Sequence, residues 1–180
     1  MDLYLTEPVG PFHQAVGAAF GTFTTRQDVS PVDLPTIPGQ KLRKGSKIIC
    51  ESRGEFSTTG TPTLVLGYYI GTVAGAITIA LAESSVITTG SGAAAWPWSL
   101  SWMGIVVGTG TSGSIVGEGY LDLGTSLTAT SRTQIPITAA LRTVAIDTTI
   151  ARAIGVCATW SASSASNTVR TNVHHVGILN

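Results

Sequence analysis

The sequence predicts an all-β fold, and within that class a jelly-roll β-sandwich of about eight antiparallel strands with an extended N-terminal arm. Three observations lead to this prediction. From residue 47 onward, apolar and polar residues alternate with a period of two. Turn residues separate these runs at intervals of roughly 8–12 residues, which is typical of sandwiches and barrels. No segment has the length and pattern of the helices that connect parallel strands.

The first expected strand illustrates the alternation. Ile48 and Cys50 fall on one face, whereas Glu51 and Arg53 fall on the other. An immunoglobulin-type sandwich is the alternative, but it usually needs only about 100 residues, and this chain has 180. One helical turn is expected over residues 138–142. The further strands are expected over residues 64–70, 77–81, 98–106, 115–123, 125–137, 143–148, 154–160 and 169–173.

The chain divides into an arm, residues 1–40, and a β-sandwich domain, residues 41–180. Five of the eight prolines lie in the first forty residues, together with four glycines, so this segment is expected to be extended. Disordered tails are poor in aromatic residues, yet this segment contains Phe12, Phe20 and Phe23. We therefore expect these three phenylalanines to anchor the arm, either on the domain itself or on a neighbouring subunit.

The composition points to assembly. Charged residues make up 11% of the chain, against about 25% in an ordinary soluble domain. A surface so poor in charge is covered either by hydroxyl groups or by contact with other subunits. The ten basic and ten acidic residues cancel. Although five of the basic residues lie between residues 41 and 53, the chain as a whole lacks the basic character of a nucleic-acid-binding domain, so no nucleic-acid partner is expected.

Neither a membrane segment nor a disulfide framework is expected. The most apolar window, residues 93–107, contains a proline and is too short to cross a bilayer, so no membrane partner is expected. The first residues lack the basic start and apolar stretch of a signal peptide. Cys50 and Cys157 are far apart in the sequence and lie in strand-like runs. We expect two buried free thiols, in keeping with synthesis in a reducing cytoplasm.

The motifs that could carry chemistry all have simpler explanations. Residues 108–113 match G-x-G-x-x-G, but a strand pattern follows where a nucleotide-binding fold needs a helix, so a hairpin turn is expected. His174 and His175 are adjacent and would point to opposite faces of a strand, which does not suit one metal ion. The acidic residues are scattered, and no nucleophile elbow is present. We expect no enzyme activity, no catalytic or metal-binding residue and no cofactor.

Trp96 is distinguished from Trp98 and Trp102 by its surroundings in the sequence. Trp98 and Trp102 alternate with Leu100 and are expected in the core. Trp96 precedes Pro97 in an expected loop. It is the candidate for an exposed contact, because such a ring can stack on a sugar or fill a neighbour's pocket.

Three segments carry a resemblance to a known family. They are GEFSTTGTPTLVLG at residues 54–67, AAAWPW at residues 93–98 and TWSASSASNTV at residues 159–169. Together they resemble a jelly-roll family of structural proteins in tailed bacteriophages, which is associated with capsid decoration, or cement, proteins. The resemblance covers residues 40–176 and implies no catalytic residues.

The resemblance implies a virion structural protein, made in the host cytoplasm and located on the capsid surface. The first hypothesis is a decoration protein that binds the outer shell as a homotrimer and stabilises it by bridging neighbouring capsomers. Its partners would then be the major capsid protein and further copies of itself. The alternatives are a tail, fibre or connector component, and a glycan-binding jelly-roll module.

Overall fold

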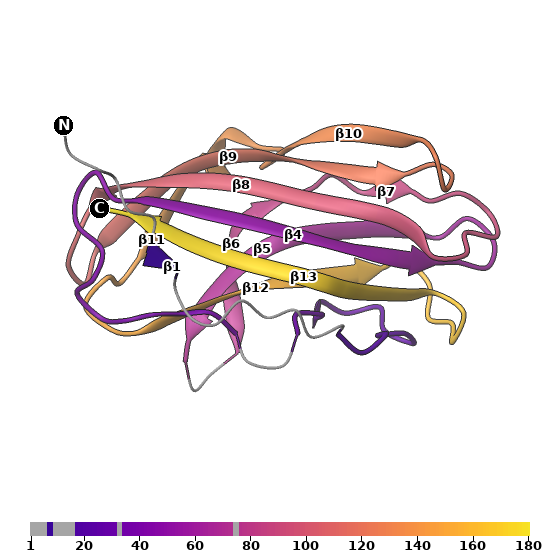
Figure 1. Cartoon of the computed structure of the whole chain (residues 1–180), viewed down its shortest axis with the longest axis horizontal. Coiled ribbons are helices and arrows are strands. Elements are labelled where there is room, and N and C mark those ends of the chain that lie inside the picture. The colour runs from indigo at the N-terminus through magenta and orange to yellow at the C-terminus, as the bar shows by residue number, and fades with distance from the viewer. Residues whose placement is uncertain (1–6, 9–16, 32–33, 74–75) are drawn as a thin grey trace.

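Two antiparallel β-sheets form the molecule (Figure 1). The computed structural model describes residues 7–8, 17–31, 34–73 and 76–180. The seven-stranded sheet has the order β1-β13-β4-β8-β9-β10, with β11 also paired to β9. The six-stranded sheet has the order β2-β12-β5-β6, with β3 on β12 and β7 on β5. The all-β class and the two-sheet arrangement of a β-sandwich are confirmed.

Thirteen strands in the described residues make up the two sheets. The strands of the seven-stranded sheet are β1 (Glu7–Pro8), β4 (Lys47–Ser57), β8 (Trp96–Gly108), β9 (Gly113–Gly124), β10 (Thr130–Ile135), β11 (Thr143–Ile146) and β13 (Thr168–Leu179). Those of the six-stranded sheet are β2 (Gln27–Asp28), β3 (Thr36–Ile37), β5 (Thr63–Thr72), β6 (Ile77–Glu83), β7 (Ile87–Thr88) and β12 (Arg152–Trp160). A short 3₁₀ helix, η1 (Ala139–Arg142), stands where one helical turn was expected.

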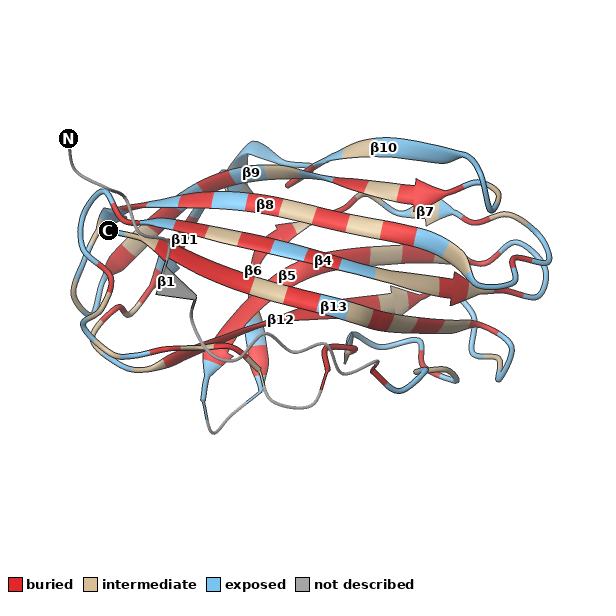
Figure 2. Ribbon diagram, in the orientation of Figure 1, coloured by how far each residue is buried: buried red, intermediate tan, exposed pale blue. Residues whose placement is uncertain are grey.

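The two-residue alternation holds along most of the long strands, as the banded colouring of β4 and β8 in Figure 2 shows. Their inward side chains meet those of β5 and β12 and form one hydrophobic core. Residues 108–113 connect β8 to β9, so the glycine-rich motif is a hairpin turn as predicted.

The alternation is interrupted in β13 and in β6, where the pairing with the neighbouring strand shifts. In β13 the register with β4 slips between Thr171 and Val173, which leaves Val173 exposed and turns His174 into the core. The strand also continues to Leu179, past the expected end at residue 173. In β6 the pairing with β5 shifts twice, so the face expected to be continuous is divided: Leu81 lies in the main core and Ile77 in a separate small cluster.

The described part of residues 1–40 packs along one side of both sheets, where β1 pairs with β13 and both β2 and β3 pair with β12 (Figure 1). Phe20 exchanges two backbone hydrogen bonds of 2.9 Å with Val169 of β13. Phe23 and Val29 belong to the main core. Phe20 and Phe23 therefore contact the same chain's sandwich, whereas Phe12 lies outside the described residues.

A small cluster on the outer side of the six-stranded sheet holds the next part of the arm. Leu34 packs there against a group that includes Tyr69 and Cys157, and the Arg26 guanidinium lies 4.7 Å from the centre of the Tyr69 ring. Burial raises the pKa of the Cys157 thiol to about 12. Cys50 belongs to the main core instead, and both thiols are free.

The tryptophan rings of the seven-stranded sheet lie over glycines. A Cβ added at Gly104 or Gly117 would come within 2.2 or 2.4 Å of the Trp102 ring, and one at Gly54 within 2.6 Å of the Trp98 ring. Any side chain at these positions would collide with an indole that is at most 2% exposed. The strands can therefore carry large rings inside a thin sandwich only because their neighbours have no side chain there.

This packing makes Gly117 a sensitive position. We expect Gly117→Ala to lower the free energy of unfolding by about 1–3 kcal/mol, because the Trp102 ring must move off its place in a filled core. Urea unfolding followed by tryptophan fluorescence measures the change. The adjacent Glu118 faces solvent, so Glu118→Gln serves as the control and should stay within about 0.5 kcal/mol of the parent. Equal stability of Gly117→Ala and parent would contradict the packing described.

Candidate functional site

A buried hydrogen-bonded group links strands of both sheets. The Ser52 hydroxyl lies 2.8 Å from Nδ1 of His174 and 2.9 Å from the Tyr68 hydroxyl. Nε2 of His174 lies 3.0 Å from the carbonyl oxygen of Ile154, and the Tyr68 hydroxyl donates to the carbonyl oxygen of Leu100 at 2.8 Å. The group thus connects β4, β8 and β13 of one sheet with β5 and β12 of the other.

The serine–histidine pair in this group is a structural tie and not an accessible nucleophile with its base. Ser52 is 1% exposed, Tyr68 0% and His174 3%. Burial also raises the pKa of the Tyr68 hydroxyl, so it stays protonated and keeps donating its hydrogen bond. Each polar atom of the group has a partner, which removes the penalty of burying it.

The outer face of the seven-stranded sheet is the accessible surface with the richest chemistry. Register places side chains of four neighbouring strands side by side there. One row runs across β4, β8, β9 and β10 as Glu51, Ser101, Tyr120 and Gln134. The next row, in the same strand order, contains Arg53, Ser99, Asp122 and Arg132. Since alternate residues share a face, both rows point to solvent.

Asp122, Arg132 and Tyr120 form a fixed cluster within these rows. Arg132 donates two hydrogen bonds of 2.8 Å, one to each carboxylate oxygen of Asp122. Its guanidinium carbon lies 4.1 Å from the centre of the Tyr120 ring. The hydrogen bond from Arg132, with help from Ser99, lowers the pKa of the Asp122 carboxyl. The bidentate pair holds the guanidinium against the ring and neutralises its charge.

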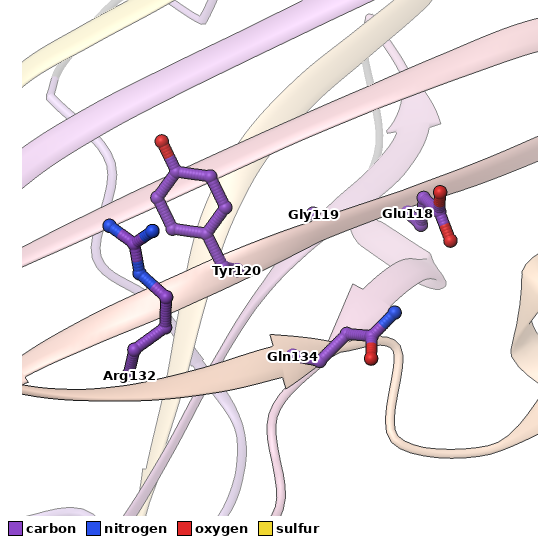
Figure 3. Close-up of a pocket in the computed structure, with 5 residues that line it drawn as sticks. All are labelled: Glu118, Gly119, Tyr120, Arg132 and Gln134. Carbon is purple, nitrogen blue, oxygen red and sulfur yellow. The ribbon is translucent and has the colours of Figure 1, made fainter.

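A shallow depression, here called the Tyr120 hollow, is lined by Glu118, Gly119, Tyr120, Arg132 and Gln134 (Figure 3). It has a volume of about 380 Å³. Figure 3 shows the arginine beside the tyrosine ring, while the amide and the carboxylate stand further along β10 and β9. A smaller depression that shares Tyr120 continues from it over β8 and β4, and a further one is linked to that depression through Asp122.

A row of apolar side chains lies on the other half of the same face. Four side chains, here called the apolar strip, are 38–46% exposed: Met103, Ile105, Val107 and Val116. The first three follow one another on the outward side of β8, and Ile105 pairs with Val116 of β9. Contiguous exposed apolar side chains, unlike single ones, are a feature of contact surfaces. The outer face therefore combines a polar hollow with an apolar strip.

The predicted contact residue Trp96 lies elsewhere, at the start of β8. Its ring meets that of Phe56 edge to face, with centroids 6.1 Å apart, and a Cβ at Gly90 would lie 2.4 Å from it. The ring is half-buried, so much of its surface is used in packing. Sequence reasoning missed Tyr120 and Arg132, although the alternation in β9 does place Tyr120 outward. Only the register of β10 brings Arg132 to it.

The remaining candidate residues do not form a site in the part of the chain that the structure describes. His174 is buried and His175 is half-exposed, so they face opposite ways as expected. Among the described residues, no three histidine, cysteine, aspartate or glutamate side chains gather closely enough to hold a metal ion. Over the same residues, no helix has the length and apolar character needed to cross a bilayer.

Comparison of the chain with protein family models, with curated proteins and with solved structures finds no match.

The Asp122–Arg132 pair gives a pH-dependent contribution to stability. Because the pKa of Asp122 is lowered on folding, its contribution is fully present above the ordinary value of 3.8 and is lost as the pH falls through the lowered value. We expect Asp122→Asn to lower Tm by about 1–2 °C at pH 7, a small effect for an exposed pair. In thermal melts below the lowered pKa of Asp122, the Tm of Asp122→Asn and the Tm of the parent should agree. A difference that persists unchanged there would contradict the pairing.

Proposed function

We propose that this chain is a structural protein of a bacteriophage virion, a capsid decoration protein that binds the outer shell and bridges neighbouring capsomers. The observation that carries the proposal is the apolar strip on the outer face of the seven-stranded sheet. The low charge of the chain points the same way, because 11% charged residues leave little to keep single copies apart in solution. The resemblance of three segments to phage jelly-roll proteins supplies the setting.

The proposed fold is a jelly-roll variant. Its support is the pairing of the first and last long strands: β4 pairs with β13 in one sheet, and β5 with β12 in the other. In a jelly roll, the two ends of the chain likewise lie side by side. The sheets also contain the β5–β6 hairpin and the β8–β9–β10 meander, in which consecutive strands pair within one sheet.

The mechanism we propose is mechanical. Each copy contacts two capsomers, so separating them requires water to enter an apolar contact. A specific interface of this kind buries about 800 Å² on each partner. Repetition over many copies multiplies the resistance without any single strong contact. The copies would sit as homotrimers at three-fold positions, with the major capsid protein as partner.

A tail, fibre or connector component is the second candidate. The apolar strip would make subunit contacts in a tail as well, so this sheet face alone does not distinguish a tail part from a decoration protein. Copy number does: quantitative mass spectrometry of purified particles should give hundreds of copies per virion for a decoration protein, and tens or fewer for a tail part.

The strip is tested by a pair of charge substitutions. Met103→Glu with Ile105→Lys should abolish binding to capsids that lack the chain, measured by co-sedimentation, because charges would have to be buried at the contact. Both side chains face solvent, so Tm should hold within a few degrees. Val86→Lys, at a residue 68% exposed outside the strip, is the matched control and should bind normally. Full binding by the double variant would refute the strip's role.

The arm is tested by a deletion that stops short of the core. Val29 and Ser30 hydrogen-bond to Val156, so removal beyond residue 16 would damage the sandwich itself. We expect deletion of residues 1–16 to leave a folded protein. The mass of the deletion variant, measured by light scattering, shows whether these residues are needed for the homotrimer. Its occupancy on heated capsids shows whether these residues add heat resistance. Unchanged mass and occupancy would remove the first sixteen residues from the proposed mechanism.

A further inference from the structure

We propose that the Tyr120 hollow binds a neutral oligosaccharide. This is a second binding function, and it lies on the polar half of the outer sheet face, next to the apolar strip. Sugars are recognised by an aromatic surface that packs on their C–H groups, together with planar polar side chains that hydrogen-bond their hydroxyls. The hollow brings these groups together on two strands.

The aromatic surface is held in place before any ligand arrives. Tyr120 is 38% exposed and stands on β9, which is paired with strands on both sides. The Arg132 guanidinium packs 4.1 Å from the ring centre and is itself fixed by two hydrogen bonds to Asp122. A ring that is already oriented loses little conformational freedom on binding, which favours a weakly interacting ligand such as a sugar.

The charges of the hollow select a neutral ligand. The positive charge of Arg132 is cancelled by Asp122 at 2.8 Å, so it offers N–H donors without a net attraction for anions. Glu118 adds a carboxylate acceptor, and Gln134 adds an amide that both donates and accepts. A sulfated or sialylated sugar would meet Glu118 and Asp122 with like charge. Hydroxyl groups, which donate and accept at once, match this set better.

The shape favours more than one sugar ring. A volume of about 380 Å³ is within the range of small-molecule sites. The next depression along the sheet shares Tyr120 and adds Glu51, Ser99 and Ser101, which extends the polar surface across β8 to β4. An oligosaccharide lying across the strands would reach both. The apolar strip begins beside it, where Met103 pairs with Glu118, and offers no comparable set of donors and acceptors.

The test is an array of neutral gluco-, galacto-, manno- and rhamno-configured oligosaccharides printed beside heparan sulfate and sialylated glycans, with the best neutral ligand then titrated by calorimetry. We expect the wild-type chain to bind at least one neutral oligosaccharide. Tyr120→Ala should weaken that binding at least tenfold, and Gln134→Ala several-fold. Tyr120→Phe keeps the ring and should stay within about threefold, in line with stacking energies of aromatic contacts.

The control is Met103→Ala on the neighbouring apolar strip, which should bind sugar like the wild type. The Tyr120 variants should melt close to the wild-type temperature, which separates loss of binding from loss of fold. Three results would each overturn the proposal: no binding to any neutral oligosaccharide, binding confined to sulfated or sialylated glycans, or equal affinity of Tyr120→Ala and wild type. Failure of capsid binding would leave this outcome unaffected, because the two surfaces are tested by different substitutions.

Discussion

The burial of indole rings between the two sheets is the interaction on which the rest of the molecule depends. Nε1 of Trp98, Trp102 and Trp160 has no hydrogen-bond partner among the described residues, which costs about 1–3 kcal/mol for each. A buried aromatic ring removes about 150–250 Å² from water, and at about 25 cal/mol/Å² this contributes about 4–6 kcal/mol. The apolar term wins, so the rings stay inside although their N–H groups are unpaired.

Specificity comes from the polar tie that crosses the same core. Apolar contact alone would tolerate a slipped strand, whereas the Ser52–His174–Tyr68 group tolerates no such slip without leaving buried atoms unpaired. The bulge after Thr171 turns His174 inward and thereby completes the tie. The register of the seven-stranded sheet then also determines the opposite face, where Tyr120, Asp122 and Arg132 meet. The inner packing and the outer surface are two consequences of one strand alignment.

The fold class could be predicted from the sequence because side-chain alternation is local: β4, β8 and the inward face of β12 follow it closely. The bulge in β13 and the two shifts in β6 could not, since they depend on how partner strands align. The same limit applies to the candidate site. Arg132 and Asp122 lie ten residues apart, and their contact exists only because the hairpin register sets Asp122 opposite Arg132. Phe23 could be predicted as an anchor from its residue type, but the surface against which it packs could not be predicted.

The arm has a consequence for behaviour at high local concentration. By pairing with β12 and β13 through β1, β2 and β3, it occupies backbone donors and acceptors that would otherwise recruit a strand from another copy. On the opposite side, the border strand β10 has six residues and carries Arg132, which makes it a poor template for further growth. Both borders of the seven-stranded sheet are thus poor templates for backbone pairing with another chain.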